Sequence, residues 1–116
     1  MITLGEIAEW ILKNRRKTAF INYTIETILD ELVRCSNDRT MLCVFEDDTI
    51  VGVVTAKVNS ECNTMYVYNI LTTKTGVIRK MLEWFRENYP NHMLEARRRG
   101  TTHKKYTNVD KLINKL

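Results

Sequence analysis

The spacing of apolar residues predicts two helices in the first third of the chain. Thr3 and Glu6 form a T-x-x-E capping box, and an apolar stripe of helical period follows at Leu4, Ile7, Ala8, Ile11 and Leu12. These features predict a helix near residues 4–14. A second stripe, at Ile25, Ile28, Leu29, Leu32 and Val33, predicts a helix that starts at Asn22 or Thr24 and ends near residues 36–38.

The middle of the chain has the composition of β-strands. Residues 41–45 and 50–58 are rich in apolar and β-branched side chains, and a polar turn at 46–49 separates them, so a β-hairpin is predicted. The adjacent carboxylates of that turn leave a metal site open, but a solvated turn is the favoured interpretation. Residues 64–71 are predicted to add a third, antiparallel strand.

After residue 71 the apolar period becomes helical. Val77, Ile78, Met81, Leu82 and Phe85 lie on one stripe, which predicts a helix over 76–88 that Pro90 ends. The loop between strand and helix, Thr72–Gly76, is short and polar. It is expected to leave backbone N–H groups free at the helix N-terminus, where the helix dipole favours a phosphate.

The remaining segments complete an α+β fold. Residues 92–97 are predicted to form a strand parallel to 64–71, Thr101-Thr102 to cap a short helix through Lys104, Lys105 and Tyr106, and the stripe Val109, Leu112, Ile113 and Leu116 to form a last helix. The expected sheet is central and mostly antiparallel, of about four strands with one parallel crossover. Its strand at 92–97 would have an open edge, which a homodimer joined edge to edge would cover.

Composition bounds the class of protein. With 116 residues, 44% hydrophobic and 28% charged, the chain is expected to be a single globular domain spanning residues 1–116. The absence of an apolar run of membrane-spanning length and of a signal peptide predicts a cytoplasmic protein without membrane contact. The three cysteines are expected to be reduced, and two scattered histidines do not suggest zinc.

Charge is uneven along the chain. Residues 95–116 contain seven basic and two acidic side chains, although the whole chain carries only +4. The basic residues Arg97–Arg99, Lys104 and Lys105 fit a solvated surface, an acidic protein, a phosphorylated cofactor or a nucleic acid. Nucleic acid ranks last because no aromatic stacking platform accompanies them in the sequence.

The element order, the hairpin FEDDTIVGVVTAKV and the run ILTTKTGVIRKMLEWFRE resemble the GNAT acetyltransferases over about residues 4–110. The resemblance implies that the loop after the third strand binds the pyrophosphate of acetyl-CoA through a Q/R-x-x-G-x-G/A segment. Gly76 matches its first glycine, whereas Thr73 and Ile78 replace the other two positions. The implied cofactor residues are Asn69, Ile70, Leu71, Thr73, Lys74, Thr75, Gly76, Val77, Ile78 and Arg79, with Asn69 or Ile70 offering a backbone N–H to the thioester carbonyl.

The resemblance also implies a catalytic role for Tyr106, which matches the tyrosine that protonates the leaving thiolate; packing on the sheet is the alternative. Glu95 and Glu61 are candidates for the general base by elimination only. The chain lacks the closing strands of the family, and small members of this kind resemble proteins encoded by bacteriophages. The favoured hypothesis is therefore an acetyltransferase-like protein that binds a host or virion protein, located in the host cytoplasm or the virion. The alternative is an acetyl-CoA-dependent N-acetyltransferase that acts on a protein or small-molecule amine.

Overall fold

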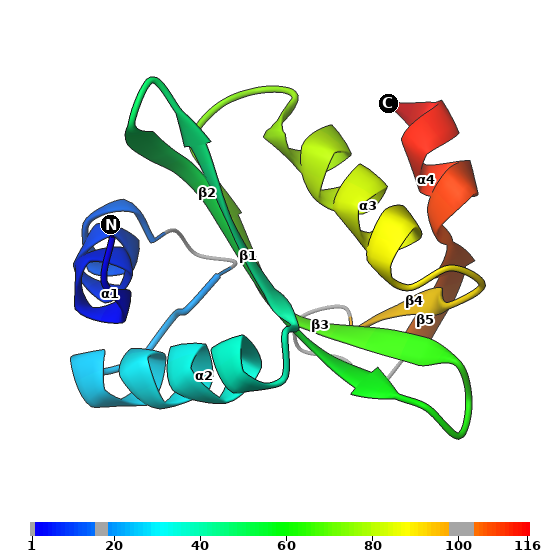
Figure 1. Cartoon of the computed structure of the whole chain (residues 1–116), viewed down its shortest axis with the longest axis horizontal. Coiled ribbons are helices and arrows are strands. Elements are labelled where there is room, and N and C mark those ends of the chain that lie inside the picture. The colour runs from blue at the N-terminus through cyan, green and yellow to red at the C-terminus, as the bar shows by residue number, and fades with distance from the viewer. Residues whose placement is uncertain (1, 16–18, 98–103) are drawn as a thin grey trace.

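The chain forms a five-stranded sheet with helices on both faces. The structure, a computed structural model, describes residues 2–15, 19–97 and 104–116, and of residues 96, 97 and 104–106 the backbone alone. Helices α1 and α2 lie against one face and α3 and α4 against the other (Figure 1). The elements are α1 (Leu4–Asn14), α2 (Ile25–Asn37), β1 (Met41–Glu46), β2 (Thr49–Asn59), β3 (Thr64–Thr72), α3 (Val77–Asn88), β4 (Met93–Arg97), β5 (Lys104–Asn108) and α4 (Val109–Lys115). The α+β class is confirmed.

The two N-terminal helices begin at the residues that the capping signals predict. The Oγ1 atom of Thr3 accepts the N–H of Glu6 at 3.1 Å, and that of Thr24 accepts the N–H of Thr27 at 3.2 Å. Each bond satisfies one of the backbone donors that a helix start leaves without a partner. Thr24 thereby decides between the two predicted starts of α2.

The β1–β2 connection is a tight two-residue turn. Asp47 and Asp48 both have left-handed backbone angles, with φ of 49° and 63°. This pair of angles is that of the type I′ turn, whose twist matches the twist of the flanking strands. Among the described side chains, no group of three or more His, Cys, Asp or Glu residues is arranged to hold a metal ion.

Strand β2 belongs to both cores because its side chains alternate between the two faces of the sheet. Val54 and Ala56 pack with α3 and α4, whereas Val53 packs with α1 and α2. Gly52 lies where α3 crosses the strand most closely. A Cβ atom on Gly52 would be 2.6 Å from both Met81 Cε and Val77 Cγ1, so only glycine fits without displacing the helix.

The predicted short helix through residues 104–106 is wrong, because this segment is strand β5. It pairs antiparallel with β4, from Met93 opposite Asn108 to Arg97 opposite Lys104. The exposed N–H and C=O groups of β4 supply hydrogen-bonding partners that no local signal reveals. The sheet therefore has one strand more than expected, and the open edge predicted at 92–97 is wrong as well. The predicted cap at 101–102 lies outside the described residues.

The three cysteines differ in exposure, which predicts their reactivity. All are free thiols: Cys35 is buried, Cys43 half-buried and Cys62 exposed. Burial raises the pKa of Cys43 to about 11 and raises the pKa of Cys35 as well. Because the thiolate is the reactive form, Ellman's reagent at pH 8 is expected to modify Cys62 first. The rate at Cys43 should rise only as the pH approaches 11. A Cys62→Ser variant should lose the fast phase, and two fast thiols at pH 8 in the parent protein would contradict this assignment.

Candidate functional site

The junction between β3 and α3 adopts the open geometry that the sequence predicted. Strand β3 ends at Thr72, and α3 begins at Val77 after the loop. Gly76 is the N-cap, with a left-handed φ of 89° and no side chain capping the helix. Glycine adopts this angle without the steric cost that a Cβ atom adds. Apart from Gly76 and its immediate chain neighbours, no described residue has an atom within 4 Å of the position that a Cβ would take at Gly76, so the space beside it is open.

The backbone amides of this loop fall into two groups. Thr73 donates its N–H to the carbonyl of Val51 at 3.0 Å, and its hydroxyl donates to the same oxygen at 3.4 Å. No acceptor in the described part of the chain takes the N–H of Lys74, Thr75 or Gly76. Together with the positive end of the α3 dipole, these groups form an arrangement suited to an anion.

A pocket of about 570 Å³ opens at the same junction. This volume lies within the range of small-molecule sites. The lining side chains include two cations and no carboxylate or histidine: Thr72, Thr73, Lys74, Thr75, Gly76, Ile78, Arg79 and Leu116. Six of the predicted cofactor residues therefore share one pocket with Thr72 and Leu116, which were not among the predicted cofactor residues.

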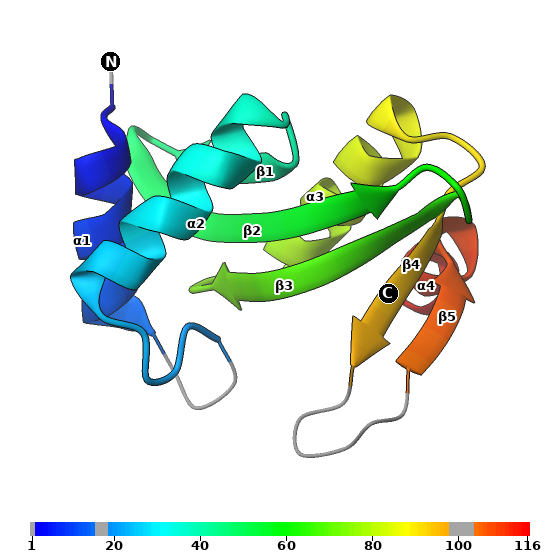
Figure 2. The same ribbon diagram turned by 90° about the horizontal axis from the view of Figure 1, so that it is seen from below.

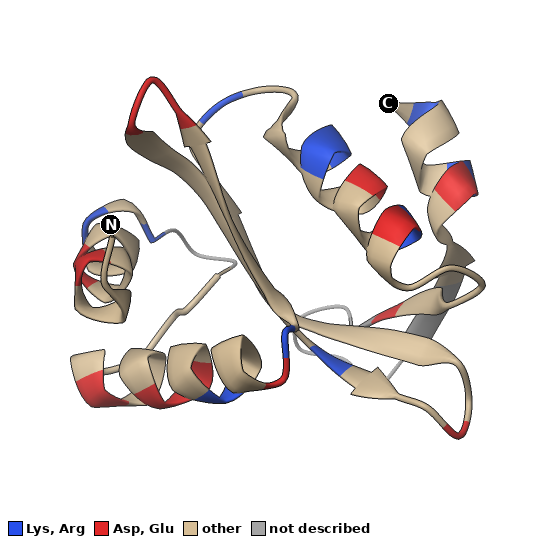
Figure 3. Cartoon of the chain, viewed as in Figure 1, with Lys and Arg blue, Asp and Glu red and all other residues tan. Residues whose placement is uncertain are grey.

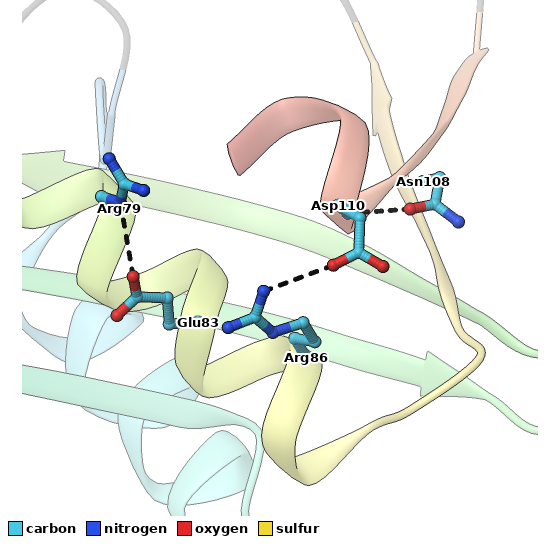
Figure 4. Close-up of polar contacts among 5 residues, drawn as sticks. All are labelled: Arg79, Glu83, Arg86, Asn108 and Asp110. Carbon is cyan, nitrogen blue, oxygen red and sulfur yellow. Dashed lines mark hydrogen bonds and ion pairs between the residues drawn. The ribbon is translucent and has the colours of Figure 1, made fainter. Parts of the chain in front are cut away.

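Helix α4 brings Leu116 to this pocket. Arg86 of α3 contacts Asp110 of α4 at 3.4 Å, and Asn108 caps α4 by accepting the N–H of Asp110 at 2.8 Å (Figure 4). Arg79, on the first turn of α3, contacts Glu83 at 3.4 Å. Lys74 makes no ion pair within the described residues and is the more available cation.

Beside the pocket, β3 and β4 diverge (Figure 2). They pair only from Thr64 opposite Met93 to Tyr66 opposite Glu95, although β3 continues to Thr72. Along an antiparallel strand, successive backbone N–H groups point alternately toward the partner strand and away from it. Since the Thr73 N–H bonds to β2, the N–H groups of Asn69 and Leu71 also face β2, and that of Ile70 faces the side from which β4 has diverged. Of the two predicted amide donors, Ile70 therefore has the suitable direction and Asn69 does not.

The Asn69 side chain belongs instead to a buried polar network on the α2 face of the sheet. Its amide nitrogen donates to Glu31 Oε2 at 2.9 Å and to the Tyr23 hydroxyl at 3.2 Å, while its oxygen accepts the N–H of Phe20 at 2.9 Å. Thr55 donates to Glu31 Oε2 at 2.9 Å, and Tyr23 donates to Oε1 at 3.1 Å. Glu31 is only 4% exposed. The network ties α2 and residues 20–23 to the central strands.

The buried polar network was not predicted from the sequence, although the sequence contains one signal of it. Glu31 lies three residues after Ile28 and one before Leu32, so it interrupts the buried stripe of α2. A charged residue on such a stripe predicts buried partners. Burial and the adjacent Glu31 raise the pKa of Tyr23, which therefore remains a proton donor to the carboxylate at neutral pH.

The other predicted residues lie at different distances from the junction. Leu71 and Val77 are buried in the cores. Tyr106 lies on β5, with its backbone opposite Glu95, and not on the helix that was expected to place it. Glu61 is in the β2–β3 turn, at the far end of β3 from the pocket.

The fold and the junction define an α+β domain with a pocket at the end of its central strand, lined by threonines and two cations. No protein-family model, curated protein or solved structure matches this chain. None of the helices in the described ranges is long and apolar enough to cross a membrane.

Proposed function

We propose that this chain is a GNAT-like domain that binds an acyl-CoA thioester at the β3–α3 junction. The observation that supports this most is the 570 Å³ pocket beside the unbonded amides of Lys74, Thr75 and Gly76. An anion of two linked phosphates fits a site that combines backbone donors, a helix N-terminus and the Lys74 ammonium group.

Two residues that differ from the GNAT pattern, Thr73 and Ile78, lower the affinity that we expect for acyl-CoA. The Thr73 amide is already bonded to Val51, so it is not available to a phosphate. Ile78 is 40% exposed and lines the pocket, where it adds bulk in place of the small residue of the family. We therefore expect acyl-CoA to bind this chain weakly.

If the thioester binds, Ile70 is the residue whose N–H would polarise its carbonyl. The coenzyme supplies an activated acyl group for attack by an amine. The chain would supply orientation through the junction and one donor from β3. This division of roles supports an N-acyltransferase acting on a protein or small-molecule amine.

A second candidate is an acetyltransferase-like protein that acts by binding a protein partner, in the virion or the host cytoplasm. Among the described residues, no Asp, Glu or His lines the junction pocket, so none of these side chains is placed there to take a proton from an amine. Exposed Ile78 and Leu116 add apolar surface at the same place. Coenzyme binding without release of free CoA in the presence of amines would favour this candidate.

Replacing Gly76 by Asp is expected to weaken acetyl-CoA binding at least about tenfold, since the added carboxylate repels the phosphates at the helix N-terminus. Titration calorimetry with acetyl-CoA measures the effect. Gly76→Asn adds nearly the same shape without charge and should retain more affinity. Gly5→Asp is the matched control, because Gly5 is exposed on α1 and its added Cβ would meet only Thr3 Oγ1, at 3.7 Å.

Three outcomes decide the proposal. Loss of heat in Gly76→Asp but not in Gly5→Asp supports binding at the junction. Equal affinity of both variants for acetyl-CoA would show that the coenzyme binds elsewhere on the protein. The absence of heat with the parent chain at millimolar acetyl-CoA overturns coenzyme binding.

A further inference from the structure

A second hollow surface lies between α1 and the β1–β2 hairpin. Two adjoining hollows of about 510 and 440 Å³ share Ile2, Glu6 and Asp48. We name this surface the α1 groove. Together its lining residues are Ile2, Glu6, Glu9, Trp10, Leu12, Lys13, Phe45, Asp48 and Ile50. None of them contributes to the pocket at the β3–α3 junction.

The floor of the α1 groove is apolar and aromatic. Ile50 is nearly buried, and Trp10, Ile2 and Leu12 are half-buried against the α1–α2 core. Phe45 is 41% exposed on β1. Exposed apolar area of this kind, bounded by polar side chains, is typical of an interaction surface.

Carboxylates dominate the rim. The described lining residues include three acidic side chains, Glu6, Glu9 and Asp48, and one basic side chain, Lys13. None of the three carboxylates makes an ion pair or a side-chain hydrogen bond within the described residues. Figure 3 shows acidic residues on α1 and at the β1–β2 turn, at the same end of the molecule.

The fold fixes the backbone at two of these acidic residues. Asp48 occupies a left-handed position of the type I′ turn, which the sheet positions rigidly. Glu6 lies in the first turn of α1, where its own N–H bonds to Thr3. Both side chains therefore start from fixed backbone positions beside the aromatic floor, so no backbone segment has to be ordered there on binding.

We infer that the α1 groove binds a basic segment of a partner protein, with an arginine or lysine side chain over Trp10. An aromatic face attracts a cation, and the neighbouring carboxylates complete its coordination. The charge of the rim disfavours nucleic acids and anionic lipids, since both would bring phosphates toward unpaired carboxylates. The inference does not depend on coenzyme binding, because the two sites share no residue.

The test uses a fluorescein-labelled octapeptide of alternating arginine and leucine and measures fluorescence anisotropy. The variant Glu6→Gln/Glu9→Gln/Asp48→Asn should bind it at least about tenfold more weakly, since three charge pairs with the basic peptide are lost together. Asparagine tolerates the left-handed angle at position 48, so the turn is retained. The matched control, Glu26→Gln/Asp30→Asn/Glu87→Gln, removes the same charge from exposed positions on α2 and α3.

The role of the floor is tested with Trp10→Leu, which keeps an apolar side chain but removes the aromatic face. It should weaken peptide binding about threefold. A loss in the triple variant and in Trp10→Leu, but not in the control, supports the inference. Equal affinity of the triple variant and the control overturns it. A dimer by light scattering that only the triple variant loses would assign the groove to a second copy of the chain and also overturn it.

Discussion

Replacement of Glu31 by alanine is expected to lower the free energy of unfolding by about 3–5 kcal/mol, because it removes the acceptor at the centre of a buried polar network. Asn69, Thr55 and Tyr23 all donate to this carboxylate. Without it, their polar groups remain buried or admit water into a packed region. Every buried side-chain nitrogen and oxygen among the described residues has a hydrogen-bonding partner, so the variant introduces a defect that the parent lacks.

Urea denaturation measures this effect, with Glu26→Ala as the matched control. Glu26 lies in the first turn of the same helix and is exposed, so its removal should cost less than about 1 kcal/mol. Glu31→Gln keeps the shape and one acceptor oxygen and should fall between the two. Equal stabilities of Glu31→Ala and Glu26→Ala would show that the network does not contribute.

Gly52→Val is expected to destabilise the fold by about 3 kcal/mol, because it overpacks the contact between β2 and α3. The new Cβ would lie 2.6 Å from Met81 Cε, which can rotate away, and 2.6 Å from Val77 Cγ1, which is much stiffer. The start of α3 must then move away from the sheet. Because Gly76 and the junction pocket lie at that end of the helix, acetyl-CoA binding should weaken as well.

The comparison uses thermal and urea unfolding of Gly52→Val, Gly52→Ala and Gly5→Val. Gly52→Ala should be intermediate. Gly5→Val adds the same side chain at an exposed position, and its effect should remain below about 1 kcal/mol. A Gly52→Val protein as stable as Gly5→Val would mean that α3 lies farther from β2 than the 2.6 Å approach to Val77 implies.

The two proposed surfaces can be separated by these experiments. The junction pocket is built by β3, α3 and the end of α4, and the α1 groove by α1 and the β1–β2 hairpin. Gly76→Asp should therefore leave arginine–leucine peptide binding unchanged, and the triple variant of the groove should leave acetyl-CoA binding unchanged.

Local signals predicted most elements because their causes are local. Thr3 and Thr24 each cap a helix by accepting the amide three residues further along the chain, and the helical stripe after Gly76 identifies the buried face of α3. The loop of the candidate site was predicted for the same reason. The polar residues and the single glycine between strand and helix were sufficient to predict the loop, whereas the left-handed N-cap at Gly76 is seen only in the structure.

The errors occurred where distant segments decide the structure. Residues 104–108 form a strand because the free edge of β4 is available to them, and their local composition does not report that edge. This pairing also removed the edge on which the homodimer prediction depended. Similarly, Ile70 and Asn69 are adjacent in the sequence, and only their register against β2 shows which amide faces away from that strand.

By itself, the sequence determined helices α1 to α4, the hairpin and the polar loop before α3, since capping, periodicity and turn propensity act within a few residues. Only the tertiary structure decided that β5 forms, that Glu31 is buried and that the loop and Leu116 line the same pocket. It also brought α1 and the β1–β2 turn together around an aromatic floor. These features depend on hydrogen-bonding partners and packing contacts between segments that are far apart along the chain, and only the folded sheet brings those segments together.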